Sequence, residues 1–112
     1  MTAVGYDPDL VFGALADPTR RDIVSRAVAG QEGVAELARY YPMSFAAVQK
    51  HIAVLERAGL ITKERVGRRK VVRTRVEGLR TAQKVLDQYE VLWQARMDQM
   101  ENVLAGEKET PR

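Results

Sequence analysis

The sequence predicts a small, mainly α-helical fold with one two-stranded β-hairpin and a long C-terminal helix. Short helical patterns bounded by Asp-Pro, Ser and Gly fill the first half of the chain. Two β-branched runs follow around a Gly-Arg-Arg segment, and one long helical stripe occupies the last third. With 112 residues, 46% of them apolar, the chain has room for one domain with a modest core. We expect this domain to span 1–112, ordered from about 6 to 105, with a disordered tail at 106–112.

Three helices are expected in the first part of the chain. Asp7 and Asp17 each precede a proline, and Asp-Pro is typical of helix starts. The carboxylate accepts hydrogen bonds from the free N–H groups of the first turn, and proline's missing N–H costs nothing at the first helical position. These signals predict helices over about 8–15 and 18–29, the second ending at a glycine. A third helix is expected over about 34–40, and it must be short because the proline that follows it prevents its continuation.

A fourth helix is expected to begin at Ser44, a favourable N-cap, and to run through Ala58. Three apolar side chains fall within one narrow sector at 100° per residue and should face the core: Val48, Ile52 and Leu55. The opposite face carries small and cationic residues: Ala46, Lys50, Ala53 and Arg57, with Gln49 on its flank. Small residues beside a cation allow this face to approach another surface closely.

The segment after the fourth helix predicts a β-hairpin. Residues 60–66 and 70–76 are the two strands, and Gly67-Arg68-Arg69 forms the tip. Arg68, Arg69 and Lys70 are three consecutive cations, which repel one another unless a counter-charge lies nearby. This favours contact with phosphate over a merely solvated tip.

The last helix is expected over about 79–104. Its apolar residues are spaced 4, 3, 4, 4, 3 and 4 residues apart, as in a coiled-coil stripe: Ala82, Leu86, Tyr89, Trp93, Met97, Met100 and Leu104. The stripe either packs on the first helix of its own chain or forms a two-fold interface, and its width favours the interface. The predicted dimer contacts are Leu10, Leu86, Tyr89, Trp93, Met97 and Met100.

The charge is unevenly distributed along the chain. Residues 50–75 carry nine bases and two acids, a net charge of +7, whereas the segments before and after them each carry −2. A basic block between acidic ones is typical of a polyanion-binding face, although a charge run can also be a solvated surface.

Several classes of function are disfavoured. The chain has no cysteine, His51 is its single histidine, and there is no glycine-rich phosphate loop, so neither an enzyme nor a bound cofactor is expected. His51 is expected to be a packing or capping residue. No run of 18 apolar residues and no signal-peptide pattern occur, which predicts a cytoplasmic protein without membrane contact.

The order of these elements is that of a winged helix-turn-helix, and four segments carry a resemblance to the ArsR/SmtB (arsenic-repressor) family of bacterial regulators. They are ALADPTRRDIV (14–24), VAELA (34–38), MSFAAVQKHIAVLERAGLI (43–61) and GRRKVV (67–72). The resemblance covers about residues 8–105. It implies a dimeric DNA-binding repressor, without enzymatic activity, that binds an inverted-repeat operator.

The resemblance further implies that the fourth helix enters the major groove and that the hairpin is a wing along the backbone. Gln49 can pair with adenine, and Lys50 can donate to guanine or phosphate. Ser44, beside the free N–H groups at the start of the helix, can bind a phosphate. Phe45 either contacts a thymine methyl or packs. The predicted DNA-binding residues are Ser44, Phe45, Ala46, Gln49, Lys50, Arg65, Arg68, Arg69 and Lys70.

The chain departs from the metal-sensing members of that family. Their sites use cysteines near the position of Glu36-Leu37-Ala38-Arg39, or Asp and His pairs on the last helix, and this sequence has neither. We therefore expect no metal site, and a signal that is a small molecule, a thiol-independent oxidant or simply protein concentration. The alternative function is a winged helix that docks proteins and does not bind DNA.

Overall fold

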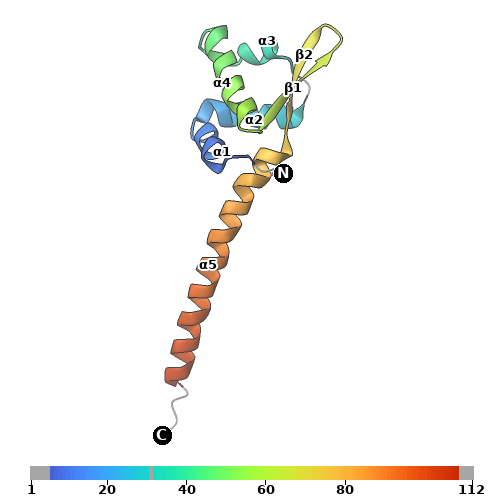
Figure 1. Ribbon diagram of the computed structural model, residues 1–112. Helices are drawn as coiled ribbons and strands as arrows, with labels where there is room; N and C mark the ends of the chain where they lie inside the picture. Colours follow the sequence, from blue (N-terminus) through green and yellow to red (C-terminus); the bar gives the residue numbers. More distant parts are fainter. Residues whose placement is uncertain (1–5, 31, 109–112) are drawn as a thin grey trace. The chain divides into compact units, whose positions relative to one another are not determined.

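The computed structural model describes residues 6–30 and 32–108 (Figure 1). The chain forms two units, the first ending at Ala82 and the second beginning at Gln83. The elements in chain order are α1 (Pro8–Leu15), α2 (Pro18–Ala29), α3 (Val34–Ala38), α4 (Phe45–Arg57), β1 (Ile61–Val66), β2 (Arg69–Thr74) and α5 (Val76–Lys108). None of the described helices is long and apolar enough to span a bilayer.

The predicted order of helices and strands is confirmed, as are the bounds of α1 and α2. Asp7 and Asp17 cap these helices as expected: Asp7 Oδ1 accepts from the Asp9 N–H at 2.8 Å and Asp17 Oδ1 from the Arg20 N–H at 3.1 Å. Gly30 ends α2 at a φ of 81°. The hydrogen bond from the Arg20 N–H also holds the pKa of the Asp17 carboxyl below its usual value.

Several predicted boundaries were wrong. The fourth helix ends one residue early, β1 begins at Ile61, and β2 runs from Arg69 to Thr74. Helix α3 ends at Ala38, two residues early. Helix α5 begins at Val76, which was expected to end the second strand, and it continues to Lys108, so residues 106–108 are helical and not part of a disordered tail. Residues 109–112, the rest of the predicted tail, lie outside the described residues.

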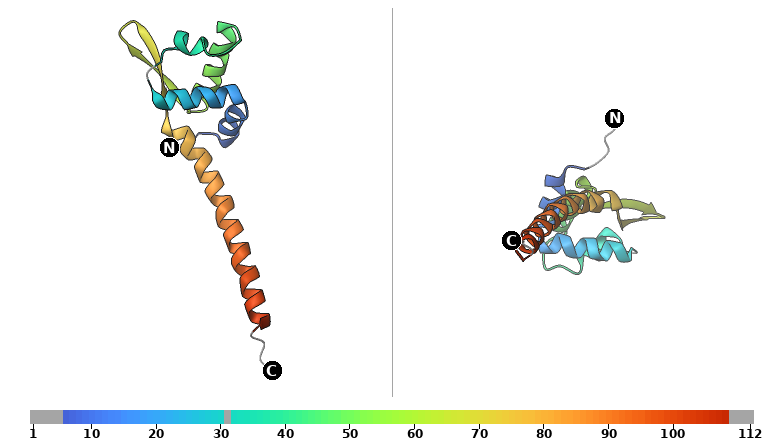
Figure 2. Two further views of the ribbon diagram at one scale, coloured as in Figure 1. Left: turned by 180° about the vertical axis from the view of Figure 1, so that it is seen from behind. Right: turned by 90° about the horizontal axis from the view of Figure 1, so that it is seen from below.

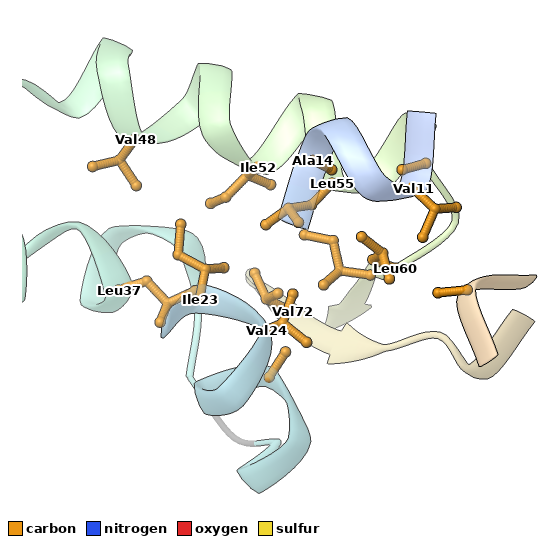
Figure 3. Close-up of a cluster of buried hydrophobic side chains, with 14 residues drawn as sticks. Val11, Ala14, Ile23, Val24, Leu37, Val48, Ile52, Leu55, Leu60 and Val72 are labelled. Carbon is orange, nitrogen blue, oxygen red and sulfur yellow. The ribbon is translucent and has the colours of Figure 1, made fainter. Parts of the chain in front are cut away.

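The core of the first unit is built from one face of each helix and the base of the hairpin (Figure 3). As predicted, α4 buries Val48, Ile52 and Leu55, each at most 1% exposed. Helix α2 begins beside α1 and reaches β2, as the view from behind shows (Figure 2, left). The other buried members are Val11, Ala14, Ile23, Val24, Ala27, Leu37, Ala58, Leu60, Ile61, Val72 and Ala82.

The hairpin pairs β1 with β2 antiparallel, and Val66 lies opposite Arg69. The turn therefore contains two residues, Gly67 and Arg68, and Arg69 belongs to the strand, not to the tip as predicted. Gly67 has a φ of 65°, as the first central residue of a type II′ turn requires. A bridge from Gly33 to Val71 ties the start of α3 to the hairpin.

The start of α5 is fixed by two glycines. The Gly78 N–H donates to the Gly59 carbonyl at 2.8 Å, and a Cβ on Gly78 would lie 2.5 Å from that oxygen. Gly59 itself has a φ of 78° and a hypothetical Cβ 2.6 Å from the Tyr6 ring. Backbone therefore packs on backbone here, and neither position tolerates a side chain.

Gly78→Ala is expected to lower the free energy of unfolding by about 2 kcal/mol or more, because the clash outweighs the gain of about 1 kcal/mol that alanine brings to a helix. Urea unfolding followed by circular dichroism measures it. Gly13→Ala is the matched control: it lies in α1 with no atom within 4 Å of its hypothetical Cβ. An equal loss in both variants would contradict the packing argument.

Candidate nucleic-acid interface

One face of α4 is exposed, and it carries the residues predicted to contact bases. Phe45, Ala46, Gln49 and Lys50 are all exposed, whereas the opposite sector is buried in the core. Ser44 Oγ accepts from the Ala47 N–H at 3.1 Å, so this hydroxyl caps the helix. Its own hydrogen is still available for donation, and a phosphate at the helix start is an acceptor of the right charge.

A groove of about 510 Å³ separates this face from the hairpin. In Figure 1, α3 lies between α4 and the strands at this end of the first unit. The groove brings together five predicted residues, Phe45, Gln49, Arg68, Arg69 and Lys70, and its other lining residues are Gly33, Val34, Ala35, Glu36, Ile52 and Lys63. The remaining predicted residues, Ser44, Ala46, Lys50 and Arg65, do not line it.

The observed register places two cations face to face. Arg65 lies directly opposite Lys70, on the same hairpin face as Lys63. Like charges in directly opposed positions destabilise a β-ladder unless a counter-ion is present. An anion bound against this face of the hairpin would therefore reduce the repulsion between the two cations.

The cations of residues 50–75 divide into two groups. Four have a carboxylate partner: Lys63 with Glu56 (3.6 Å), Arg75 with Glu77 (3.3 Å), Arg69 with Glu36 and Arg73 with Glu64. For the other five, the described part of the chain provides no ion-pair partner: Lys50, Arg57, Arg65, Arg68 and Lys70. Four of these five were predicted to contact DNA, and their charge is not neutralised within the protein.

Glu36 links α3 to the hairpin. Its Oε1 accepts from the Gly33 N–H at 2.7 Å and from Arg69 Nη2. These partners hold the pKa of the Glu36 carboxyl below its usual value, the Gly33 N–H having the larger effect. A Cβ on Gly33 would lie 3.1 Å from the Lys70 carbonyl, so the two segments are closely packed.

Arg20 fixes α4 to the preceding helices. Its Nε donates to the Ala14 carbonyl at 2.8 Å and its Nη2 to the Gly13 carbonyl at 3.1 Å, which caps the C-terminal end of α1. Its Nη1 donates to His51 Nδ1 at 3.2 Å, since a guanidinium can only donate. His51 therefore positions α4 from the side, in agreement with the packing role expected for it.

The turn that enters α4 is anchored to α2. The Tyr41 hydroxyl donates to Asp22 Oδ2 at 2.7 Å, and Arg26 Nε donates to the same oxygen at 2.9 Å. Burial and the bond to Asp22 raise the pKa of Tyr41, while the Tyr41 and Arg26 bonds lower the pKa of Asp22. Arg26 also lies over the Tyr40 ring, 3.6 Å from its centroid.

The second unit is the remainder of α5, and most of its predicted interface side chains are exposed. Trp93 is 61% exposed and Tyr89 64%, with Leu86 and Met100 near one half, whereas Met97 is half-buried. Tyr89, Trp93, Met97 and Met100 line one shallow hollow together with Leu92 and Arg96. In the first unit, Leu10 of α1 is exposed, and its place in an interface stays a prediction.

Sequence reasoning missed three contributors to this end of the first unit. Lys63 lines the groove, and strand alternation could have indicated it, because it shares a face with Arg65. Glu36 and Arg20 act through contacts between segments far apart in sequence, which no local pattern indicates. Within residues 6–30 and 32–108, no three His, Cys, Asp or Glu side chains are grouped so that they could hold a metal ion.

Comparison with known proteins identifies relatives along most of the chain. No protein-family model matches it. It is 42% identical over 82 residues to the HTH-type transcriptional regulator Rv2034 of Mycobacterium tuberculosis, covering 73% of this chain and 77% of that protein. The crystal structure of the ArsR family transcriptional regulator RHA00566 is 32% identical, with a TM-score of 0.71 over 81% of this chain and 97% of that one.

A third similarity concerns the fold alone. The solution structure of the homodimeric winged helix-turn-helix DNA-binding domain Mb0332 from Mycobacterium bovis is 22% identical, with a TM-score of 0.55 over 80% of this chain and 81% of that one. Together with the helices, the two-stranded wing and the exposed face of α4, these relatives confirm the resemblance read from the sequence. The chain belongs to the ArsR family of winged helix-turn-helix transcriptional regulators.

Proposed function

We propose that this regulator is a dimeric repressor that binds an inverted-repeat operator in duplex DNA through α4 and the wing, which is the hairpin β1–β2. The observation that supports this most strongly is the exposed face of α4 beside wing cations that have no carboxylate partner in the described part of the chain. A docking module without DNA binding would have no use for such cations. The regulator acts in the cytoplasm.

The two parts of the interface differ in what they recognise. Gln49 and Lys50 are exposed on the helix that would enter the major groove, where their donors and acceptors can distinguish base edges. Arg68 and Lys70 extend from the wing, where guanidinium and ammonium groups suit phosphate. Phosphate contacts position the protein but carry little sequence information.

Dimerisation is proposed from the apolar stripe of α5. Exposed Trp, Tyr, Leu and Met side chains on one helix face form a patch of the kind that marks protein interfaces. The M. bovis domain with the same fold is homodimeric. A two-fold dimer presents two recognition helices about one DNA turn apart, which requires an inverted repeat.

The inducing signal is proposed to be something other than a metal ion. The chain has no cysteine, and Nδ1 of its single histidine accepts a hydrogen bond from Arg20. Neither thiolate nor paired imidazole ligands are therefore available for zinc-like or soft ions. The signals that remain are a small molecule, a thiol-independent oxidant and protein concentration itself.

Sequence-specific binding is tested by selecting duplexes from a randomised library. Gln49→Ala or Lys50→Ala is expected to cost about 1–3 kcal/mol on the selected operator and to relax the preference at particular base positions, because each removes a base contact. Lys84→Ala, on α5, is the control and should leave the preference unchanged. If the wild-type protein selects no sequence, the proposed function is wrong.

A further inference from the structure

Glu36 stands out on the surface that would face DNA. Among the side chains lining the groove in the described part of the chain, it is the one carboxylate, beside Lys63, Arg68, Arg69 and Lys70. A negative charge at this place lowers the attraction of the groove for a polyanion. The presence of the Glu36 carboxylate in this groove therefore indicates a role that involves Arg69, the cation paired with it.

The Glu36–Arg69 pair is exposed and can be exchanged. The Glu36 side chain is 47% exposed and the Arg69 side chain 52%. Ion pairs with this exposure contribute little to stability and are screened by salt, since water competes for both partners. A DNA phosphate, which offers Arg69 an equivalent anion, can therefore replace the carboxylate at small cost.

Glu36 also has a second partner that remains when the first leaves. Its Oε1 accepts from the Gly33 N–H at 2.7 Å, at the start of α3. If Arg69 turns away, the carboxylate keeps this hydrogen bond and its exposure to water. Loss of the ion pair therefore leaves no unsatisfied polar group, and α3 keeps the bond at its start.

Arg69 is well placed for either partner. It is the first residue of β2, directly after the turn, and its neighbours Arg68 and Lys70 line the same groove. Because all three of these side chains line the groove, a phosphate held there is a nearby alternative partner for the Arg69 guanidinium.

We propose that Glu36 holds Arg69 in the free protein and releases it to a phosphate when DNA binds, so that Glu36 is a positioning residue that weakens binding to all duplexes. This inference rests on the proposed function. It explains why an acid lies in a cationic groove: the exchange reduces the affinity for any duplex and leaves discrimination to α4.

Glu36→Gln tests the exchange, because glutamine keeps an oxygen for the Gly33 N–H and removes the charge that binds Arg69. The variant is expected to bind operator and unrelated duplex about 3- to 10-fold more tightly at the same salt concentration. The slope of log K against log salt should steepen by up to about 1 per protomer, because the wild-type carboxylate takes up a cation when Arg69 leaves. Fluorescence anisotropy titrations measure both quantities.

Two comparisons separate this exchange from a general effect of charge. Glu64→Gln is the matched control, since Glu64 forms the same kind of exposed pair with Arg73 in the wing but does not line the groove. We expect it to change affinity less than about 2-fold. In an Arg69→Ala background, the gain from Glu36→Gln should fall to the level of this control.

A purely structural role for the pair gives different results. If the pair only stabilises the wing, Glu36→Gln would weaken duplex binding, and this outcome overturns the proposal. The proposal is also overturned if Glu36→Gln raises the affinity just as much in the Arg69→Ala background. The unmodified protein gives a second test, because the Arg69 side-chain NMR resonance should shift when duplex is added, and an unchanged resonance also overturns the proposal. If the wild-type protein binds no duplex, the proposed function fails; if it binds but Glu36→Gln gives no gain, only the exchange fails.

Discussion

Replacing both Arg68 and Lys70 with alanine is expected to weaken binding to every duplex, specific or not, on the order of 100-fold for the dimer. Both cations lie on the wing without a carboxylate partner in the described part of the chain. The variant neutralises fewer phosphates, so the salt dependence should become shallower by about 0.9 for each phosphate that is no longer bound. Anisotropy titrations on operator and on random duplex, at several salt concentrations, measure this.

Arg73→Ala is the matched control for this variant. Arg73 also lies in β2, but it is paired with Glu64 within the wing. Its removal should change affinity less than about 3-fold, since a neutralised cation contributes little to phosphate binding. Equal losses of affinity from both changes, or a loss confined to the operator, would contradict the assignment of the wing to the DNA backbone.

Trp93→Ala is expected to raise the dimer dissociation constant about 30-fold or more, because truncation of a tryptophan near the centre of an interface typically costs at least 2 kcal/mol. The side chain is 61% exposed and lies in the middle of the apolar stripe. Sedimentation equilibrium measures the change in mass. Operator affinity should fall together with the dimer, since a monomer contacts only one half-site.

Val91→Ala is the matched control, because it truncates an exposed side chain of α5 outside the apolar stripe. Val91 is as exposed as Trp93, at 67%, but helical periodicity places it on the opposite side of the helix. We expect it to leave the dimer intact. A Trp93→Ala variant that remains a tight dimer would show that the interface lies elsewhere.

Local signals were sufficient for most of the fold. Asp7 and Asp17 mark helix starts because a carboxylate satisfies first-turn N–H groups wherever the rest of the chain lies, and the structure confirms both. The sector of Val48, Ile52 and Leu55 likewise identified the buried face of α4. These features depend only on neighbouring residues, so one sequence is enough to predict them.

The register of the wing could not be predicted in this way. Gly67 allows either a two- or a three-residue loop, and the sequence favoured a tip that included Arg69. The observed type II′ turn shifts the pairing by one residue and brings Arg65 opposite Lys70. A shift of one residue changes every cross-strand neighbour, so the cation pair became visible only in the structure.

Contacts between distant segments could not be predicted from the sequence either. Arg20 meets His51 and Glu36 meets Arg69, over separations of 31 and 33 residues. Neither pair has a local pattern, because the packing of α2 on α4 and of α3 on β2 decides which side chains meet. In the sequence, Glu36 belongs only to a motif that corresponds to the metal sites of relatives, and its place in the groove gives it a different role.

The most direct test of the central claim is the salt dependence of wild-type binding to duplex DNA. If the wing cations Arg65, Arg68 and Lys70 of each protomer contact phosphate, the logarithm of the association constant should fall linearly with log salt at a slope of about −5, roughly a thousandfold loss of affinity between about 50 and 200 mM. Binding that is absent on all duplexes, or insensitive to salt, would show that α4 and the wing do not form a DNA-binding surface.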